Sequence, residues 1–414
     1  MNHDPFFDRL EELRDLAAGR DLSRISRRLL DFLADVDVPD EVRIKAISHR
    51  AAYNAFAAQE KALQRPEKYD ELMERAASVV HEIEQVFLGA QTTFESVVHE
   101  REVAIDQPIF LGKKLYKRFS SSNFVFELPR LDLELNLGEI TGIVGENGNG
   151  KTTLLRIVAG DLAIDGGDVS YPCLPAEQGD WYTIKQHIAF IPQSLKSWPG
   201  LLKENLHFTA AIHGIRGAEN EAIVDFMIHR LGLTQYEQAT WKEISSGYKL
   251  RFELARALVR KPSLLIIDEP LANLDINTQE IFLQDLRYLA DSIRNPLSVL
   301  ISSQHLHEVE SIADNIIFMK NGEALYNGKM QEFGQDRSEN IFELGTQLSR
   351  KVVEERMMPL GILSVEDTGR HLILHTPLDF DNARVMAKLV EANIPVEYFR
   401  DISKSTLKLF REGS

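Results

Sequence analysis

A glycine-rich segment at residues 145–152, GENGNGKT, carries the residue types that point most directly to chemistry. It fits the pattern G-x-x-x-x-G-K-[ST], after an apolar run at 140–144 and before a helical run at 154–158. Glycines leave backbone N–H groups open to phosphate oxygens, and the N-terminus of the next helix adds positive potential. Lys151 would reach the β- and γ-phosphates of a nucleotide, and the Thr152 hydroxyl would bind Mg²⁺. The predicted phosphate-binding residues are Gly145, Glu146, Asn147, Gly148, Asn149, Gly150, Lys151, Thr152 and Thr153.

Two carboxylates form a second candidate site. Residues 264–267 are an apolar run of strand length, and Asp268 and Glu269 follow it directly. Such a pair is often a solvated turn, but carboxylates at the end of a buried strand are costly unless a ligand uses them. With a phosphate loop upstream, Asp268 fits a Mg²⁺ partner, and Glu269 fits the base that orients or deprotonates an attacking water.

The elements around these residues predict three parts. Residues 1–104 have apolar residues at helical spacing, in four segments, the third reaching about residue 63, and are expected to form a small helical interaction module. Residues 105–334 alternate strands and helices, which predicts an α/β part with a mainly parallel sheet. Residues 335–414, after a charged linker, predict a small βαββαβ domain.

Composition excludes several classes of protein. The chain has 414 residues, 47 basic and 63 acidic, for a net charge of −16, and a single cysteine, Cys173. The N-terminus does not resemble a signal peptide and no run approaches the roughly 20 apolar residues of a membrane span, so we expect a cytoplasmic protein that reaches the inner face of a membrane only through a partner. The acidic balance disfavours non-specific binding to nucleic acid.

The order of these motifs resembles the nucleotide-binding subunit of ABC (ATP-binding cassette) ATPases over residues 106–333. Residues 244–258, ISSGYKLRFELARAL, resemble the signature sequence of that family and the helix behind it. Ser246 and Tyr248 depart from the usual glycine and glutamine, whereas the phosphate-facing Ser245 and Gly247 are kept. The resemblance implies a P-loop NTPase cassette with a helical subdomain that binds ATP and Mg²⁺ and hydrolyses ATP to ADP and phosphate.

Other family elements have counterparts in this sequence. Gln193 matches the glutamine that contacts Mg²⁺ and couples to a partner, and Asp275 matches the aspartate of the loop that crosses a dimer interface. Phe119 is the expected aromatic that stacks on adenine, with Tyr116 as a rival and an ordinary core position as the alternative for either.

The histidine switch of the family falls on Gln304 here, and His305 follows it. Neighbouring residues in extended chain point to opposite sides, so His305 could substitute only after a local backbone shift. Glutamine can hydrogen-bond a γ-phosphate but cannot carry its proton. We therefore expect Glu269 to be the main catalytic residue, with Lys151 and Gln304 assisting, and hydrolysis to be slow.

In this family the signature completes the site of a second subunit, so the resemblance implies a homodimer around two Mg-ATP. The sequence after Gln193 and the C-terminal unit are similar to those of drug- or polysaccharide-type exporters, which favours a subunit that energises a separate membrane permease. The helical N-terminal module resembles adaptor domains of bacterial conflict and signalling proteins, which favours an alternative, a regulatory or defence switch that acts on an effector protein. A packing extension of the ATPase is the other interpretation of this module. A nucleic-acid-associated ATPase is the third reading, which the charge disfavours.

Overall fold

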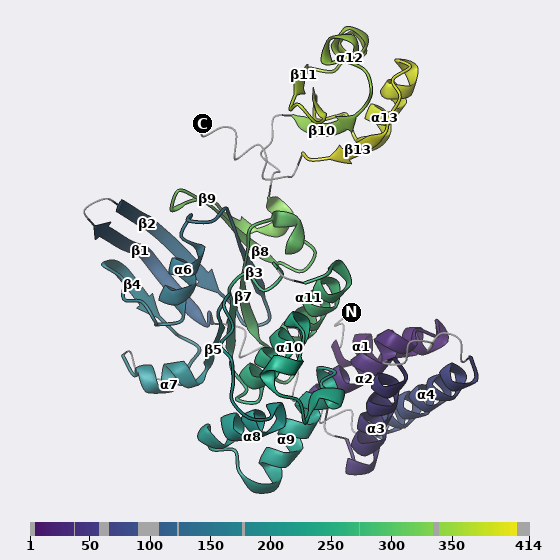
Figure 1. Cartoon of the computed structure of the whole chain (residues 1–414), viewed down its shortest axis with the longest axis vertical. Coiled ribbons are helices and arrows are strands. Elements are labelled where there is room, and N and C mark those ends of the chain that lie inside the picture. The colour runs from purple at the N-terminus through teal and green to yellow at the C-terminus, as the bar shows by residue number, and fades with distance from the viewer. Residues whose placement is uncertain are drawn as a thin grey trace. The chain divides into compact units, whose positions relative to one another are not determined.

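The computed structural model describes residues 5–36, 38–57, 66–89, 107–121, 124–175, 179–272, 274–333 and 339–403 (Figure 1). The chain forms two compact units, Met1–Ala324 and Leu325–Ser414. The helical residues before position 105 thus share a unit with most of the α/β part. The predicted boundaries at 104/105 and 334/335 stay predictions. No helix in the described part is long and apolar enough to cross a membrane.

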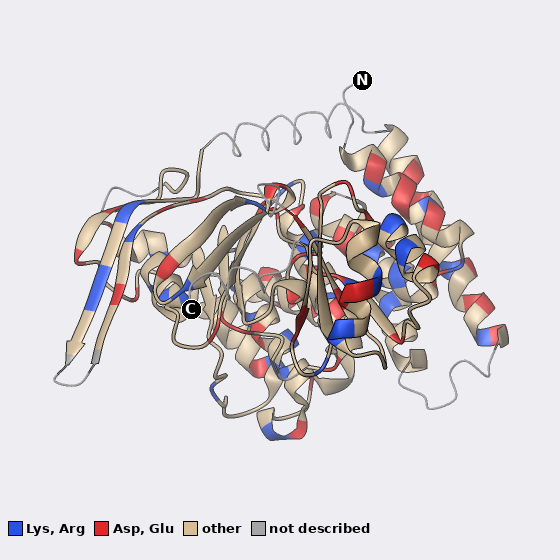
Figure 2. Ribbon diagram, turned by 90° about the horizontal axis from the view of Figure 1, so that it is seen from above, with Lys and Arg blue, Asp and Glu red and all other residues tan. Residues whose placement is uncertain are grey.

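The first unit begins with a helical bundle, as the apolar spacing predicted. Its helices are α1 (Pro5–Ala18), α2 (Leu22–Asp35), α3 (Asp40–Ala57) and α4 (Pro66–Gly89). Leu10, Leu29 and Ile83 belong to its shared core and are almost fully buried. Acidic and basic residues both lie along the helices of the bundle (Figure 2). The third helix is described over Asp40–Ala57, and the predicted extension to residue 63 lies outside the described residues.

Two sheets follow the bundle along the chain. A six-stranded sheet has the order β5-β6-β7-β3-β8-β9, and a three-stranded antiparallel sheet has the order β2-β1-β4. In the larger sheet β3 runs parallel to β7 and β8, and β6 runs parallel to β5 and β7. The strands are β1 (Phe110–Ser121), β2 (Phe124–Leu135), β3 (Ile140–Val144), β4 (Gly166–Ser170), β5 (Ile188–Ile191), β6 (Leu264–Ile267), β7 (Ser298–Ser303), β8 (Asn315–Lys320) and β9 (Glu323–Lys329).

The parallel register explains where the site lies. Because carboxyl ends of parallel strands meet at one edge of a sheet, the segments after β3, β6 and β7 converge there. Those three strands are buried along their whole lengths, as their apolar composition requires. The helices of this unit beyond the bundle are α6 (Lys151–Val158), α7 (Trp181–Gln186), α8 (Leu202–Ile212), α9 (Gly217–Arg230), α10 (Ser246–Leu258) and α11 (Ile276–Ala290), with short 3₁₀ turns η2 (Thr234–Tyr236), η3 (Trp241–Glu243) and η4 (Leu306–Glu308).

The bundle joins the rest of its unit through buried charges. Asp31 on α2 accepts hydrogen bonds at 2.8 Å from Arg28 of its own helix and from Arg230 on α9. Burial opposes ionisation of Asp31, but the charges of Arg230 and Arg28 outweigh it and hold the pKa of that carboxyl below its usual range. The guanidinium of Arg28 also lies over the ring of Tyr288 on α11.

A second acidic residue of α2, Asp35, also connects the bundle to the rest of the first unit. The Asp35 carboxylate pairs with Arg9 and accepts a hydrogen bond from the Ser292 hydroxyl. Ile293 is buried in the core of the bundle, and Phe226 of α9 packs against that core. The helical module is therefore built onto the α/β part by both apolar and ionic contacts.

The second unit forms the predicted split βαββαβ fold. Its elements are β10 (Asn340–Gly345), α12 (Arg350–Met357), β11 (Ser364–Asp367), β12 (Leu372–Thr376), α13 (Asn382–Glu391) and β13 (Tyr398–Asp401). The antiparallel strand order is β11-β12-β10-β13. The fold class predicted from the sequence is confirmed in all three of its parts.

The Arg230–Asp31 contact allows a test of how the bundle is held to the α/β part. Arg230→Ala should lower the free energy of unfolding by about 3 kcal/mol, because it leaves a buried carboxylate with one cation fewer. Urea unfolding followed by circular dichroism measures this change. Arg14→Ala removes an arginine from an exposed pair with Glu84 inside the bundle and should cost less than about 1 kcal/mol. Equal costs for the two variants would show that the buried contact does not hold the parts together.

Candidate active site

The loop at residues 145–150 joins β3 to α6 and has the backbone that a phosphate cradle requires. Gly148 and Gly150 have φ angles of 86° and 97°, a region that favours glycine. A Cβ on Gly145 would lie 2.4 Å from the Met319 carbonyl oxygen, so only glycine fits where the loop passes β8. The loop leads directly into the N-terminus of α6, where backbone N–H groups favour an anion.

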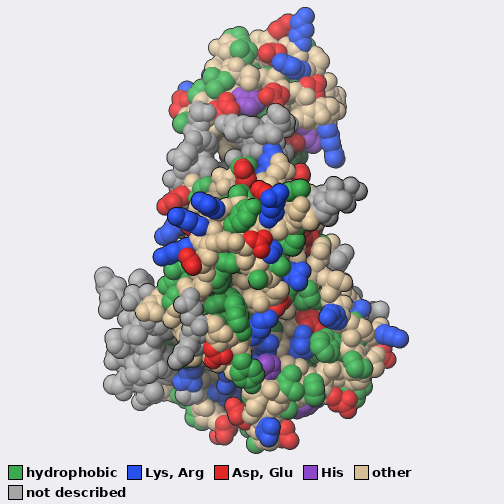
Figure 3. Space-filling model, turned by 90° about the vertical axis from the view of Figure 1, so that its left-hand side faces the viewer, with side chains coloured by type: hydrophobic (Ala, Val, Ile, Leu, Met, Phe, Trp, Pro, Cys, Tyr) green, Lys and Arg blue, Asp and Glu red, His purple; other side chains and the backbone are tan. Residues whose placement is uncertain are grey.

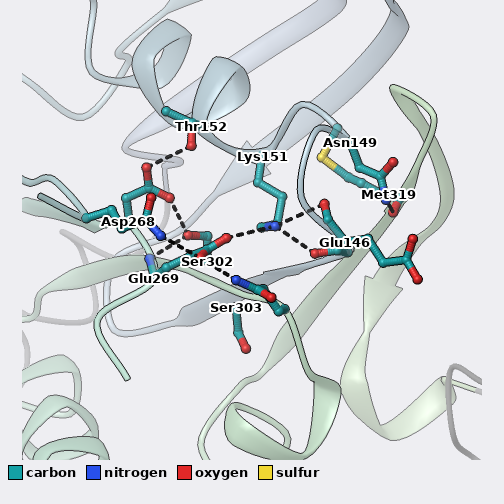
Figure 4. A network of polar contacts seen from close by, with 12 residues as sticks. Glu146, Asn149, Lys151, Thr152, Asp268, Glu269, Ser302, Ser303 and Met319 are labelled. Carbon is teal, nitrogen blue, oxygen red and sulfur yellow. Dashed lines mark hydrogen bonds and ion pairs between the residues drawn. The ribbon is translucent and has the colours of Figure 1, made fainter. Parts of the chain in front are cut away.

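Asn149 braces this loop against the neighbouring strand. Its side-chain amide donates to the Met319 carbonyl oxygen at 3.2 Å, and its side-chain oxygen accepts from the Asn321 backbone N–H at 2.9 Å (Figure 4). The sequence placed Asn149 among the phosphate-binding residues. The structure gives its side chain a structural role, leaving its backbone for the anion.

Lys151 lies at the centre of the site and is 4% exposed. Its amino group donates to the carbonyl oxygens of Gly145 at 2.6 Å and Glu146 at 3.2 Å, and lies 3.0 Å from Glu269 Oε1 (Figure 4). The predicted phosphate-binding cation and the predicted base are therefore paired with each other. A γ-phosphate that approached Lys151 would compete with Glu269 for its charge.

Thr152 and Asp268 bring together the oxygen atoms that Mg²⁺ prefers. The Thr152 hydroxyl donates to Asp268 Oδ2 at 2.8 Å, and Ser302 on β7 donates to Asp268 Oδ1 at 2.7 Å. A hydroxyl and a carboxylate side by side, next to a phosphate loop, fit a Mg²⁺ ion that keeps several water ligands. The described residues contain no group of three or more His, Cys, Asp or Glu that could hold a metal ion.

Glu269 occupies a strained backbone position at the end of β6. Its φ is 45°, uncommon for a residue with a side chain, and its N–H donates to the Ser302 hydroxyl at 2.8 Å. Glu269 Oε2 accepts 2.8 Å hydrogen bonds from both Gln193 and Gln304. Residues separated widely in the sequence thus converge on one carboxylate, and Gln193 keeps its side-chain oxygen as an acceptor for a cation or water.

The structure separates Gln304 from His305. Gln304 directs its amide to Glu269, as a residue that positions the base would. The His305 ring stacks on His307, with 5.4 Å between ring centres, and its residue caps η4. In this arrangement Gln304, and not His305, lies at the predicted base, without any backbone shift.

The signature residues lie at the start of α10. Ser245 caps the helix and is exposed, and Gly247 packs against Thr278 at the start of α11. Asp275 caps α11 and accepts hydrogen bonds from the Thr278 hydroxyl and N–H, which hold the pKa of Asp275 below its usual range. The signature and the predicted dimer-crossing segment therefore form one neighbouring surface, beside the Ile276 side chain, which is 80% exposed.

The aromatic candidates lie on β1. Phe119 pairs across the strands with Phe126 on β2, whose ring would contact a Cβ on Gly150 of the phosphate loop. This register places Phe119 on the face that meets the loop, whereas Tyr116 directs its hydroxyl toward Glu127 at 3.5 Å. Sequence reasoning missed Phe126, which the alternation of Phe124, Phe126 and Leu128 could have indicated. It also gave no role to Ser302, although the serine pair before Gln304 was visible.

The comparisons with known proteins agree with this geometry. The sequence model of the ABC transporter family matches residues 128–272. The chain is 30% identical over 239 residues to the ABC transporter ATP-binding protein NatA of Bacillus subtilis, covering 54% of this chain and 92% of NatA. It is 33% identical over 225 residues to a putative ATP-binding protein of Brucella abortus, covering 53% of this chain and 61% of that protein.

A solved structure supports the fold. CbiO1 from Clostridium perfringens, part of the ABC transporter complex cbiONQ, superposes with a TM-score of 0.50 at 21% identity, covering 62% of this chain and 98% of that one. The match is to the fold of the ATP-binding cassette.

Three substitutions test the division of roles around Glu269. Glu269→Gln should reduce ATP turnover by about 100-fold or more, the scale of losing a general base. Gln304→Ala should reduce it by about tenfold through misplacement of Glu269, and His305→Ala should change it less than about twofold. Phosphate release under saturating Mg-ATP measures all three. If only His305→Ala abolished turnover, the assignment of Gln304 would be wrong.

The cassette fold, the phosphate loop, the oxygen ligands for Mg²⁺ and the sequence relatives lead to one identification. The chain belongs to the ABC transporter ATP-binding protein family and is an ATPase that binds ATP with Mg²⁺.

Proposed function

We propose that this protein dimerises around two Mg-ATP and energises a separate membrane transporter subunit, of the drug- or polysaccharide-exporter type. The observation that carries the proposal is the division of the nucleotide-binding groups within one chain. Lys151, Thr152, Asp268 and Glu269 form one connected network, whereas the signature residues Ser245 and Gly247 are presented at the N-terminus of another helix. A second copy would bring its signature to the γ-phosphate.

The residues of the chain then have separate tasks. Loop N–H groups and Lys151 would hold the phosphates, and Thr152 and Asp268 would hold a Mg²⁺ ion, which would supply positive charge next to the phosphates. When the γ-phosphate takes over the amino group of Lys151, Glu269 is released to orient or deprotonate the attacking water. Gln193 and Gln304 hold the Glu269 carboxylate in place, and Phe119 stacks on adenine.

A hollow beside Gln193 supports a membrane partner. A cavity of about 540 Å³ is lined by residues that follow Gln193, among them Leu195 and Trp198, and by Glu253 and Arg256 of α10. Apolar, basic and acidic side chains are mixed on the face of the molecule drawn in Figure 3. Phe208 and Ile212 of α8 are more than 60% exposed. A partner that inserted an apolar segment here would contact the residues next to the Mg²⁺ site and the signature helix together. The proposed location is the cytoplasmic face of a membrane, through this partner.

One observation favours the alternative, a regulatory or defence switch acting on an effector protein. The bundle α1–α4 is part of the same compact unit as the ATP site, so an effector bound to the bundle would be mechanically connected to ATP binding. The identity of the captured partner distinguishes a permease from a soluble effector.

ATP-dependent association is the first test. Glu269→Gln should bind ATP without hydrolysing it, so its mass by light scattering should rise from one chain to two when Mg-ATP is added. Lys151→Ala in the same background should stay monomeric, because it weakens phosphate binding. A Glu269→Gln protein that stays monomeric in saturating Mg-ATP would contradict the dimer.

Capture of the partner is the second test. Tagged Glu269→Gln protein should recover an integral membrane protein from detergent-solubilised membranes of the source cells, more in ATP than in ADP. Trp198→Ala should reduce recovery several-fold without changing ATP affinity, because it removes a ring that lines the hollow. Recovery of a soluble protein that depends on the bundle, with no membrane protein, would favour the alternative.

A further inference from the structure

The signature helix carries a residue whose role the ATPase chemistry does not explain. Tyr248 replaces the glutamine usual in the family and lies in the first turn of α10, next to Gly247. Its ring packs against Tyr236 of η2 with 4.2 Å between ring centres and an angle of 51°. Gln235 directs its amide to the Tyr248 hydroxyl at 3.4 Å. Tyr248 is therefore held on the turn that precedes the signature.

The same turn is held from the other side by the N-terminal bundle. Asn54 of α3 donates to the Thr234 hydroxyl at 3.5 Å, and Arg50 of α3 donates to the His229 carbonyl oxygen at 3.3 Å. Thr234 Oγ1 lies 3.1 Å from His229 Nδ1. Helix α3 therefore contacts the end of α9 and the start of η2.

Arg50 and the signature helix also meet at Gly232. A Cβ on Gly232 would lie 3.3 Å from Arg251 Nη1 and 3.5 Å from Arg50 Nη2, so both guanidinium groups pack against this glycine. Arg251 lies on α10 over the Tyr248 ring, at 5.6 Å. Arg50 is 4% exposed, and its burial lowers the pKa of its guanidinium to about 10. Arg50 is therefore enclosed by the groups that pack around it.

We propose that Tyr248 is a positioning residue, through which helix α3 of the N-terminal bundle sets the orientation of the signature motif. Two routes converge on it, one from Asn54 through η2 to Tyr236, the other from Arg50 through Arg251. The inference rests on the proposed ATP-dependent dimer, because the signature acts on the nucleotide of the other copy.

The physical reason lies in the geometry of a helix N-terminus. The Gly247 N–H and the Ser245 hydroxyl can stabilise a γ-phosphate only if the first turn of α10 points at it, and such contacts weaken steeply with misplacement. Ser245 is exposed, and its side chain makes no capping hydrogen bond to α10. A bulky aromatic packed against a fixed turn limits the motion of that first turn.

The side chains on the opposite side of α10 make other contacts. Glu253 accepts a hydrogen bond from the Trp198 indole at 2.5 Å and pairs with Arg256. These residues line the hollow beside Gln193, whereas Tyr248 and Arg251 contact η2 and the bundle side. The signature helix therefore lies between the module and the proposed partner site, and Tyr248 fixes its N-terminal end.

The test uses the full chain in the Glu269→Gln background, which separates association from hydrolysis. Tyr248→Ala should weaken ATP-dependent dimerisation by about tenfold or more, the scale of one aromatic pair, as measured by analytical ultracentrifugation in Mg-ATP. The affinity of the monomer for a fluorescent ATP analogue should stay within about twofold, because that site is built by Lys151 and its neighbours. Tyr248→Phe keeps the ring and should restore dimerisation to within about threefold.

Variants of α3 test the connection to the bundle. Arg50→Ala should also weaken dimerisation, and its effect combined with Tyr248→Ala should be smaller than the product of the two, because both act on the same turn. Asn54→Ala, less buried, gives a second measurement if Arg50→Ala unfolds. Lys45→Ala removes a cation of α3 that pairs with Glu82 inside the bundle and is the matched control.

Each outcome has a distinct meaning. If the Glu269→Gln protein itself fails to dimerise, the proposed function is wrong. If it dimerises and Tyr248→Ala associates equally well, the positioning role is wrong. If Tyr248→Ala weakens dimerisation but the effects of Arg50→Ala and Asn54→Ala match that of Lys45→Ala, the connection to the bundle is wrong. Loss of monomer ATP binding in parallel with dimerisation would assign Tyr248 to general stability instead.

Discussion

The parallel pairing of β3, β6 and β7 is the constraint on which the site depends. It forces three segments, beginning at residues 145, 268 and 304, to emerge at one edge of the sheet. Carboxylates, hydroxyls and an amino group then meet where the strands no longer supply backbone partners. Lys151 and Glu269 neutralise each other at 3.0 Å, which makes their shared burial tolerable. Because Lys151 is paired with the Glu269 carboxylate, a phosphate anion can bind Lys151 by taking the place of that carboxylate.

Local sequence was sufficient for the parts of the fold that local rules govern. The phosphate loop is recognisable because glycine, lysine and threonine at fixed spacing have few other uses, and the apolar periodicities distinguish the bundle from the sheet. The βαββαβ order of the second unit followed from the same patterns.

Contacts between distant segments could not be predicted in this way. Nothing in the residues near Asn149 says that its amide contacts the carbonyl of Met319 instead of a phosphate. The choice between Gln304 and His305 depended on the backbone after β7, and the pairing of Phe119 with Phe126 depended on a register with irregularities along β1. The side chains of Arg28, Asp31 and Arg230 are buried together in the structure, although charged side chains lie mostly on protein surfaces. Side chains with ambiguous chemistry take their roles from tertiary contacts.

The ionic and apolar contacts between the bundle and the ATP-binding part affect how a shorter fragment of this protein would behave. A fragment that began near residue 107 would uncover Phe226, Ile293 and Tyr288 and would leave Arg230 without its aspartate. The fragment would then expose a surface patch that is both apolar and basic, although the protein as a whole is acidic. Such a fragment would be prone to stick to itself and to polyanions. If nucleic acid co-purified with such a fragment, the cause would be the newly exposed patch. It would not indicate that the intact protein binds nucleic acid.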